Sequence, residues 1–201
     1  MLTLPTDFDA ACSWFAQRLD TARQPASSDI HIDGDTTPAA VLVPIILHAS
    51  GATVLFTKRT ERLAKHAGQI SFPGGRMELE ETPEQAALRE TAEEVGLAEH
   101  FICPVGRLAH YTTISRYRVT PVVAMVKPGF ELTLQADEVA EAFEVPLAWL
   151  LDRSNFREKG LNLPENRLVS YALDWQGKII WGATAGMLMM LYKTLIDEEK
   201  P

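Results

Sequence analysis

The chain has 201 residues, of which 46% are hydrophobic and 23% charged, a balance that indicates one globular domain with a substantial core. Its formal net charge of −8 argues against a surface that coats nucleic acid. The two cysteines provide neither a disulfide framework nor a zinc knuckle, so we expect a reducing, cytoplasmic compartment. No apolar run reaches the ~18 residues of a membrane helix, and we expect no membrane partner.

The N-terminal segment is predicted to form a helix followed by a linker. Apolar residues recur at helical spacing over residues 7–23, whereas residues 24–38 are rich in proline, serine, aspartate, glycine and threonine. We therefore expect an N-terminal helix and linker over residues 1–38 and a main domain over residues 39–201.

The main domain is predicted to open with a β-hairpin. The β-rich runs 39–48 and 52–59 flank Ser50 and Gly51, a pair typical of a tight turn. Pro44 lies inside the first run and has no N–H to donate, which predicts an edge strand or a bulge at that point.

The later elements alternate between strands and helices. Residues 116–126 are predicted to form a strand, and residues 141–152 a strand that passes into a short helix. Gln176-Gly177 marks a second hairpin, and residues 182–196 form an apolar, methionine-rich helix. Strands interleaved with helices, together with hairpins, predict an α/β fold layered on a mixed sheet.

A helix from Pro83 to Val95 has clear boundary signals. Thr82 is suited to cap it, Gln85 completes a capping box, and Gly96 is suited to the position after its C-terminal end. Proline at the first helical position also favours the start, because its missing N–H has no helical partner there.

Three carboxylates of this helix lie within one arc of its surface. Glu90, Glu93 and Glu94 are predicted to project together, away from the core. The side predicted to face the core carries Leu88, Thr91, Ala92 and Val95. A solvated acidic face is the ordinary interpretation of such a helix. However, three carboxylates beside a Gly-Gly turn also form an oxygen-ligand set that suits Mg²⁺ or Mn²⁺, to which the turn adds a backbone carbonyl.

The spacing of these residues resembles the signature of the Nudix hydrolase family, G-x5-E-x7-R-E-U-x-E-E-x-G-U, where U is aliphatic. The matching residues are Gly75, Glu81, Arg89, Glu90, Glu93, Glu94, Gly96 and Leu97. Thr91 departs from the pattern, since it stands at the first aliphatic position. The resemblance implies the Nudix fold, an α/β/α sandwich around a mixed sheet, and metal-dependent hydrolysis of a nucleoside diphosphate linked to another group.

The resemblance also implies roles for individual residues. Glu90, Glu93 and Glu94 are expected to bind the metal, with the Gly75 carbonyl as a backbone ligand. Glu81 is expected to close the loop or to bind a second metal. Arg89 is expected to orient one of the glutamates through a charge-assisted hydrogen bond.

The general base is expected outside the signature, because some family members use a glutamate from a later loop. Residues 135–147 offer Glu138 and Glu141, of which we favour Glu138. An exposed loop charge without a catalytic role is an equally good interpretation of Glu138.

A second, narrower pattern precedes the first. It resembles L-L-T-x-R-S-x3-R-x3-G-x3-F-P-G-G, which is found in the coenzyme A pyrophosphatase branch of the family. The matching residues are Leu55, Phe56, Thr57, Arg59, Gly68, Phe72, Pro73, Gly74 and Gly75. Thr60 replaces the usual serine or alanine, and Ala64 replaces the usual arginine, which is the more important departure.

Basic residues are concentrated between the two patterns. Coenzyme A carries a pyrophosphate and a ribose 3′-phosphate, and both need cationic partners. The candidate substrate-binding residues are Lys58, Arg59, Arg62, Lys65 and His66. We therefore expect conversion of coenzyme A or its derivatives to 3′,5′-ADP and 4′-phosphopantetheine.

Three alternatives remain open at this point. Ala64 leaves room for another substrate, namely ADP-ribose, a dinucleoside polyphosphate or a nucleotide sugar. A Nudix module that binds nucleotides without catalysis is a lesser alternative. Many family members dimerise, so a homodimer is a further alternative that no residue here tests.

Overall fold

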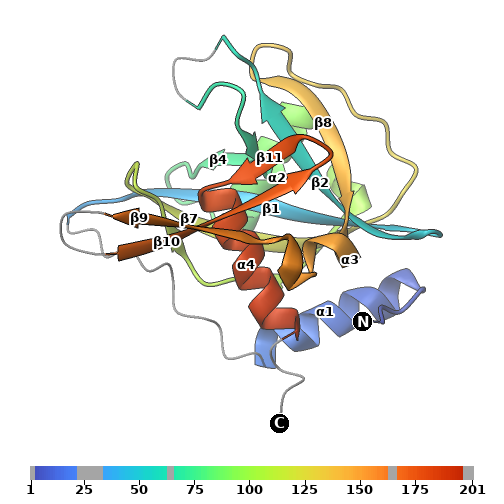
Figure 1. The fold of residues 1–201 in the computed structure, drawn as a ribbon. Helices are drawn as coiled ribbons and strands as arrows, with labels where there is room; N and C mark the ends of the chain where they lie inside the picture. Colours follow the sequence, from blue (N-terminus) through green and yellow to red (C-terminus); the bar gives the residue numbers. More distant parts are fainter. Residues whose placement is uncertain (1–2, 22–33, 63–65, 163–166, 197–201) are drawn as a thin grey trace.

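The computed structural model describes residues 3–21, 34–62, 66–162 and 167–196 (Figure 1). The predicted linker over residues 24–38 therefore lies largely outside the described residues, as do Ala64 and Lys65. Within the described ranges, no helix is both long enough and apolar enough to cross a membrane.

Eight strands form the main sheet, with the order β3-β2-β1-β7-β5, while β4 also pairs with β1, β6 with β7 and β8 with β2. The strands β1 and β7 run parallel, and the other pairs are antiparallel, which confirms the predicted mixed sheet. Their bounds are β1 (Thr37–His48), β2 (Gly51–Arg59), β3 (Ile70–Ser71), β4 (Gly74–Arg76), β5 (Ile102–Arg107), β6 (Tyr111–Thr112), β7 (Tyr117–Val126) and β8 (Val139–Pro146).

A second, antiparallel sheet contains β9 (Arg157–Asn162), β10 (Arg167–Trp175) and β11 (Lys178–Trp181). The predicted turn between β10 and β11 is confirmed, since Gln176 and Gly177 have φ values of +52° and +83°. Two successive positive φ values match the turn type whose twist suits an antiparallel hairpin.

The helices cover both faces of the main sheet (Figure 1). Their bounds are α1 (Phe8–Thr21), α2 (Pro83–Val95), α3 (Leu147–Leu150) and α4 (Ala183–Ile196), and two short 3₁₀ turns span Glu99–Phe101 and Arg153–Asn155. One core lies between the sheet and α1, α3 and α4, and includes the buried Phe15, Phe56 and Leu191. Two smaller clusters lie between α2 and the opposite face, which confirms the α/β/α sandwich. The helix α1 thus covers the sheet, and the division of the chain at residue 38 stays a prediction.

Pro44 does not lie on an edge strand, so that alternative was wrong. The strand β1 pairs with β7 along one side, and on its other side with β4 over residues 39–41 and with β2 over residues 45–48. Pro44 falls in the gap between these two antiparallel partners, where a missing N–H breaks no ladder hydrogen bond on that side. A central strand tolerates proline here because its neighbour changes at that residue.

Candidate active site

The glutamate helix α2 is fixed at both ends by the predicted caps. Thr82 Oγ1 accepts a hydrogen bond from the Gln85 amide (3.3 Å), and Gln85 Oε1 accepts one from the Thr82 amide (2.8 Å). Gly96 ends the helix in the left-handed conformation, with φ +70° and its N–H bonded to the carbonyl of Ala92. These contacts satisfy backbone groups that a helix leaves unpaired at its ends, so they set where its glutamates lie.

The face that α2 buries differs from the predicted one. Thr91 and Val95 are buried as expected, but Ala92 is exposed and Ala87 takes its place against the sheet. Glu94 does not project away from the core, because only 7% of its side chain is exposed, against 60% for Glu93. The helix is rotated so that Glu94 faces β4, a position that helical spacing alone does not reveal.

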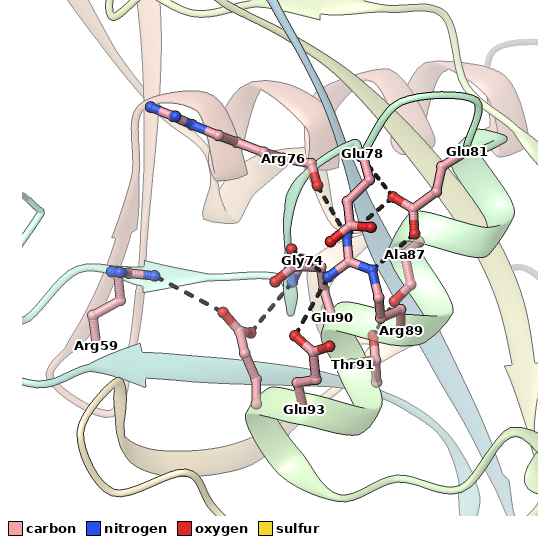
Figure 2. A network of polar contacts seen from close by, with 11 residues as sticks. Arg59, Gly74, Arg76, Glu78, Glu81, Ala87, Arg89, Glu90, Thr91 and Glu93 are labelled. Atoms are coloured by element: carbon pink, nitrogen blue, oxygen red, sulfur yellow. Dashed lines mark hydrogen bonds and ion pairs between the residues drawn. The ribbon is translucent and has the colours of Figure 1, made fainter.

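Arg89 is the centre of the polar network shown in Figure 2. Its Nε and Nη2 donate to the two carboxylate oxygens of Glu81, at 2.8 and 3.1 Å. Its Nη1 donates to Glu90 (2.9 Å) and Glu93 (3.3 Å), and Nη2 also donates to the carbonyl of Arg76 (3.1 Å). One guanidinium thus ties the loop before α2 to two glutamates of the helix.

Glu81 holds the loop that leads into α2. Its Oε2 accepts the backbone N–H of Glu78 at 2.7 Å while both of its oxygens face Arg89. The hydrogen bond from Arg89 is the largest cause that lowers the pKa of Glu81 to about 2. Glu81 therefore remains ionised at neutral pH, and its contacts are those expected of a residue that stabilises the loop.

Glu94 is a buried carboxyl with few partners. The Gly74 N–H donates to its Oε2 at 3.3 Å, and Arg59 Nη1 lies 3.9 Å from its Oε1. Burial raises the pKa of Glu94 to about 7, although both partners oppose this shift. The charges of Glu90 and Glu138 raise it further. A cation beside this carboxyl would lower its pKa and relieve the repulsion between the three glutamates.

Glu90 lies directly against Gly75 of β4. A Cβ atom at residue 75 would be 2.5 Å from the carboxyl carbon of Glu90, so a side chain at this position would displace the carboxylate. Burial is the largest cause that raises the pKa of Glu90, and the charges of Glu93 and Glu138 act in the same direction. Glycine at position 75 therefore leaves the space that Glu90 occupies.

The structure separates the two glutamates considered as general bases. Glu138 is close enough for its charge to act on both Glu90 and Glu94. Glu141 instead binds Lys178, whose Nζ lies 2.6 and 2.7 Å from its carboxylate oxygens. Glu141 is thus engaged in an ion pair, whereas the charge of Glu138 raises the pKa of two carboxyl groups of α2.

Of the predicted basic residues that the structure describes, Arg59 is the one with an ion-pair contact to the acidic cluster, 3.9 Å from Glu94. Its Nε is buried and has no hydrogen-bond partner within the described ranges. Lys58 lies 4.0 Å from Glu61, Arg62 is exposed, and His66 is exposed with Nδ1 2.7 Å from Gln69 Oε1. Lys65 lies outside the described residues.

The glutamates fit a cation in charge and chemistry. In the part of the chain that the structure describes, no three acidic, histidine or cysteine side chains converge closely enough to hold a metal ion. Glu90 and Glu93 bind Arg89 (Figure 2). Glu94 instead accepts from the Gly74 N–H and lies 3.9 Å from Arg59. Even so, the burial of Glu94 beside two further carboxylates concentrates negative charge where oxygen ligands suit Mg²⁺ or Mn²⁺.

The comparison with known proteins agrees with this fold and site. The sequence pattern described as the NUDIX domain matches residues 36–163. A relative from Pectobacterium atrosepticum, named uncharacterized Nudix hydrolase NudL, is 33% identical over 194 residues that cover 96% of this chain and 98% of the relative. Another protein of that name, from Photorhabdus laumondii, is 37% identical over 154 residues, which cover 76% of this chain and 82% of the relative.

Solved structures show the same fold. A Nudix hydrolase from M. smegmatis, RenU, matches with a TM-score of 0.50 and 24% identity over 61% of this chain and 79% of that chain. A MutT/nudix family protein from Enterococcus faecalis matches with a TM-score of 0.53 and 15% identity, covering 95% of this chain and 70% of that chain.

These matches and the loop–helix site show that the chain belongs to the Nudix family. More particularly, it is a Nudix hydrolase, an enzyme that acts on a pyrophosphate substrate. Members of this family generally use divalent metal ions.

Two features of the site were missed by sequence reasoning. The Gly74 N–H and the Arg76 carbonyl are backbone groups, so residue types give no sign of their contacts with Glu94 and Arg89. The Gly-Gly pair was the available signal, since adjacent glycines allow other groups to approach the backbone closely.

Gly74→Ala and Gly75→Ala form a matched pair of variants. A methyl group at residue 74 would lie 2.4 Å from the backbone oxygen of Ala40, at φ +149°, so we expect a loss of about 1–3 kcal/mol in unfolding free energy. At residue 75 the methyl group meets only the flexible end of Glu90, and we expect a loss within about 1 kcal/mol. Urea denaturation measures both values. Equal destabilisation would contradict this account of the two glycines.

Proposed function

We propose that the enzyme hydrolyses the pyrophosphate bond of coenzyme A or its derivatives, giving 3′,5′-ADP and 4′-phosphopantetheine. The observation that carries the proposal is the contact between Arg59 and Glu94, whose side-chain atoms lie 3.9 Å apart. Arg59 belongs to the pattern of the coenzyme A branch and Glu94 to the general signature. Their contact supports a site where a phosphate lies between the guanidinium of Arg59 and a metal ion held by Glu94.

A buried N–H group of Arg59 without a hydrogen-bond acceptor in the described part of the chain supports phosphate binding. Its Nε is buried without a hydrogen-bond acceptor in the described part of the chain, and such a donor is costly unless a ligand satisfies it. A guanidinium presents several N–H groups in a plane that suits phosphate oxygens. We propose that Arg59 binds the diphosphate and that Arg62, His66, Lys58 and Lys65 contribute to the 3′-phosphate end.

We propose that Glu90, Glu93 and Glu94 hold Mg²⁺ or Mn²⁺ together with the Gly75 carbonyl. When bound, the ion neutralises phosphate charge and lowers the pKa of water. Arg89 holds Glu90 and Glu93 in place, and Glu81 holds Arg89. Glu93 is exposed, so its side chain can turn toward Glu94 without disturbing the core.

We propose that Glu138 accepts the proton of the attacking water. The charge of its carboxylate acts on Glu90 and Glu94, whereas both carboxylate oxygens of Glu141 accept from Lys178. A base needs a free lone pair within reach of the nucleophile, and the ion pair with Lys178 makes Glu141 the poorer candidate.

Two free cysteines, Cys12 and Cys103, support the proposal of a reducing, cytoplasmic compartment. The homodimer stays a prediction. Ala64 keeps a second candidate function open, in which the same chemistry acts on ADP-ribose, a dinucleoside polyphosphate or a nucleotide sugar, because the coenzyme A pattern has arginine at that position.

A substrate panel tests the proposed function. We expect coenzyme A to be hydrolysed with a higher kcat/KM than dephospho-coenzyme A, ADP-ribose, a dinucleoside polyphosphate or a nucleotide sugar, with Mg²⁺ or Mn²⁺ present. Dephospho-coenzyme A is the matched control, since it lacks only the 3′-phosphate. A clear preference for ADP-ribose would overturn the coenzyme A assignment and leave the hydrolase chemistry intact.

Glu94→Gln tests the metal-ligand assignment. Glutamine keeps the shape and accepts the Gly74 N–H but removes the negative charge, so we expect kcat to fall by at least about 100-fold. The unfolding temperature should change little, because the variant keeps the hydrogen bond from Gly74 and removes the cost of burying a charge. Turnover near the wild-type value in saturating Mg²⁺ would show that Glu94 is not a ligand.

Glu138→Gln and Glu141→Gln discriminate between the two candidate bases. Loss of a general base lowers turnover by roughly 10²–10⁴-fold, and we expect this for Glu138→Gln. Glu141→Gln weakens a contact with Lys178 on β11, and we expect its kcat to stay within about threefold of wild type. Steady-state kinetics measure both, and the reverse order of effects would reassign the base.

A further inference from the structure

The segment that carries Glu138 is fastened to α2 at one end. The backbone N–H groups of Thr133 and Gln135 donate to the carbonyls of Val95 and Glu94, each at 2.9 Å. The last carbonyls of a helix have no partner within the helix, so these bonds satisfy them. The segment thereby begins beside the backbone of the residue whose side chain lies in the site.

Thr60 fastens the other end of the segment. Its backbone N–H donates to the Glu138 carbonyl at 2.9 Å, and its hydroxyl donates to the Asp137 carbonyl at 3.1 Å. Thr60 is 7% exposed, so water competes little for these bonds. Two successive carbonyls of the segment are therefore held by one residue.

An irregularity in the pairing of β2 with β8 lies directly beside this contact. The pairing of β2 with β8 changes register between Lys58 and Arg59, so Arg59 faces Val139 and Ala140 is left over. Such irregularities re-aim side chains beside functional sites. Thr60 is the next residue after Arg59, and Glu138 the residue before Val139. The two hydrogen bonds of Thr60 thus set the positions of Arg59 and Glu138 relative to each other.

We propose that Thr60 is a positioning residue that acts through Glu138. Its hydroxyl holds the 137–138 backbone so that the Glu138 carboxylate stays beside Glu90 and Glu94. The inference rests on the proposed function, because it gives Thr60 a role in the reaction only where Glu138 is the base. Serine at this position keeps the hydroxyl, whereas valine keeps the shape and removes it.

The variants Thr60→Val, Thr60→Ser and Thr184→Val test the inference. Thr184 is the matched control, because its buried hydroxyl (6% exposed) also donates to a backbone carbonyl, that of Ile70, at 3.1 Å. With coenzyme A and, in parallel, ADP-ribose as substrates, we expect Thr60→Val to lower kcat on the order of tenfold with KM within about twofold. Thr60→Ser and Thr184→Val should stay within about twofold of wild type in kcat.

The double variant Thr60→Val/Glu138→Gln shows whether Thr60 acts through Glu138. If it does, Thr60→Val costs no further turnover once Glu138 is replaced, since residues that act as one unit are not additive. Independent, multiplying effects of the two substitutions would overturn the inference, as would full activity of Thr60→Val.

Hydrogen exchange gives a readout that needs no substrate. We expect the amides of residues 137–139 to exchange about fivefold faster in Thr60→Val than in wild type, and to be unchanged in Thr184→Val. Unchanged exchange in Thr60→Val would show that the hydroxyl does not hold the segment. If exchange is faster in Thr60→Val but wild type hydrolyses no substrate, the hydrogen bond from Thr60 to the segment is confirmed. The proposed function and the role of Thr60 in the reaction are then both wrong.

Discussion

The site depends on a carboxylate, Glu94, that is packed against a sheet. A buried carboxylate is unfavourable without partners, and among the described residues Glu94 has one backbone N–H and one guanidinium at 3.9 Å. Its elevated pKa expresses this cost. Carboxyl groups with strongly perturbed pKa values are concentrated at functional sites, which is why Glu94 is central to the proposed function.

The packing that buries Glu94 requires small residues on both sides. On the helix, Ala87 and Thr91 allow α2 to approach the sheet closely. On the sheet, Gly74 lies against the backbone of β1, where a side chain has no room, and Gly75 lies against the Glu90 carboxylate, which a side chain would displace. The Gly-Gly pair therefore serves two purposes at once, because it brings β4 onto β1 and leaves space for the acidic cluster.

The remaining parts of the site are held by one ion-pair network and by the hydrogen bonds of Thr60 to two backbone carbonyls. Arg89 joins Glu81 of the loop to Glu90 and Glu93 of the helix. Thr60 joins the end of β2 to the segment that carries Glu138. Residues from four separate stretches of the chain, β2, β4, α2 and the loop before β8, are thus brought to one place.

The sequence by itself determined the elements with strong local signals and the identity of the acidic cluster. Caps defined α2, the turn pairs Ser50-Gly51 and Gln176-Gly177 defined the hairpins, and signature spacing selected Glu90, Glu93 and Glu94. These signals are local, since each depends on residues a few positions apart. Only the tertiary structure decided the rotation of α2 that buries Glu94, the central place of Pro44, and the ion pair of Glu141 with Lys178. Each of these depends on which distant segment lies alongside, and the periodicity of one segment carries no information about its neighbour.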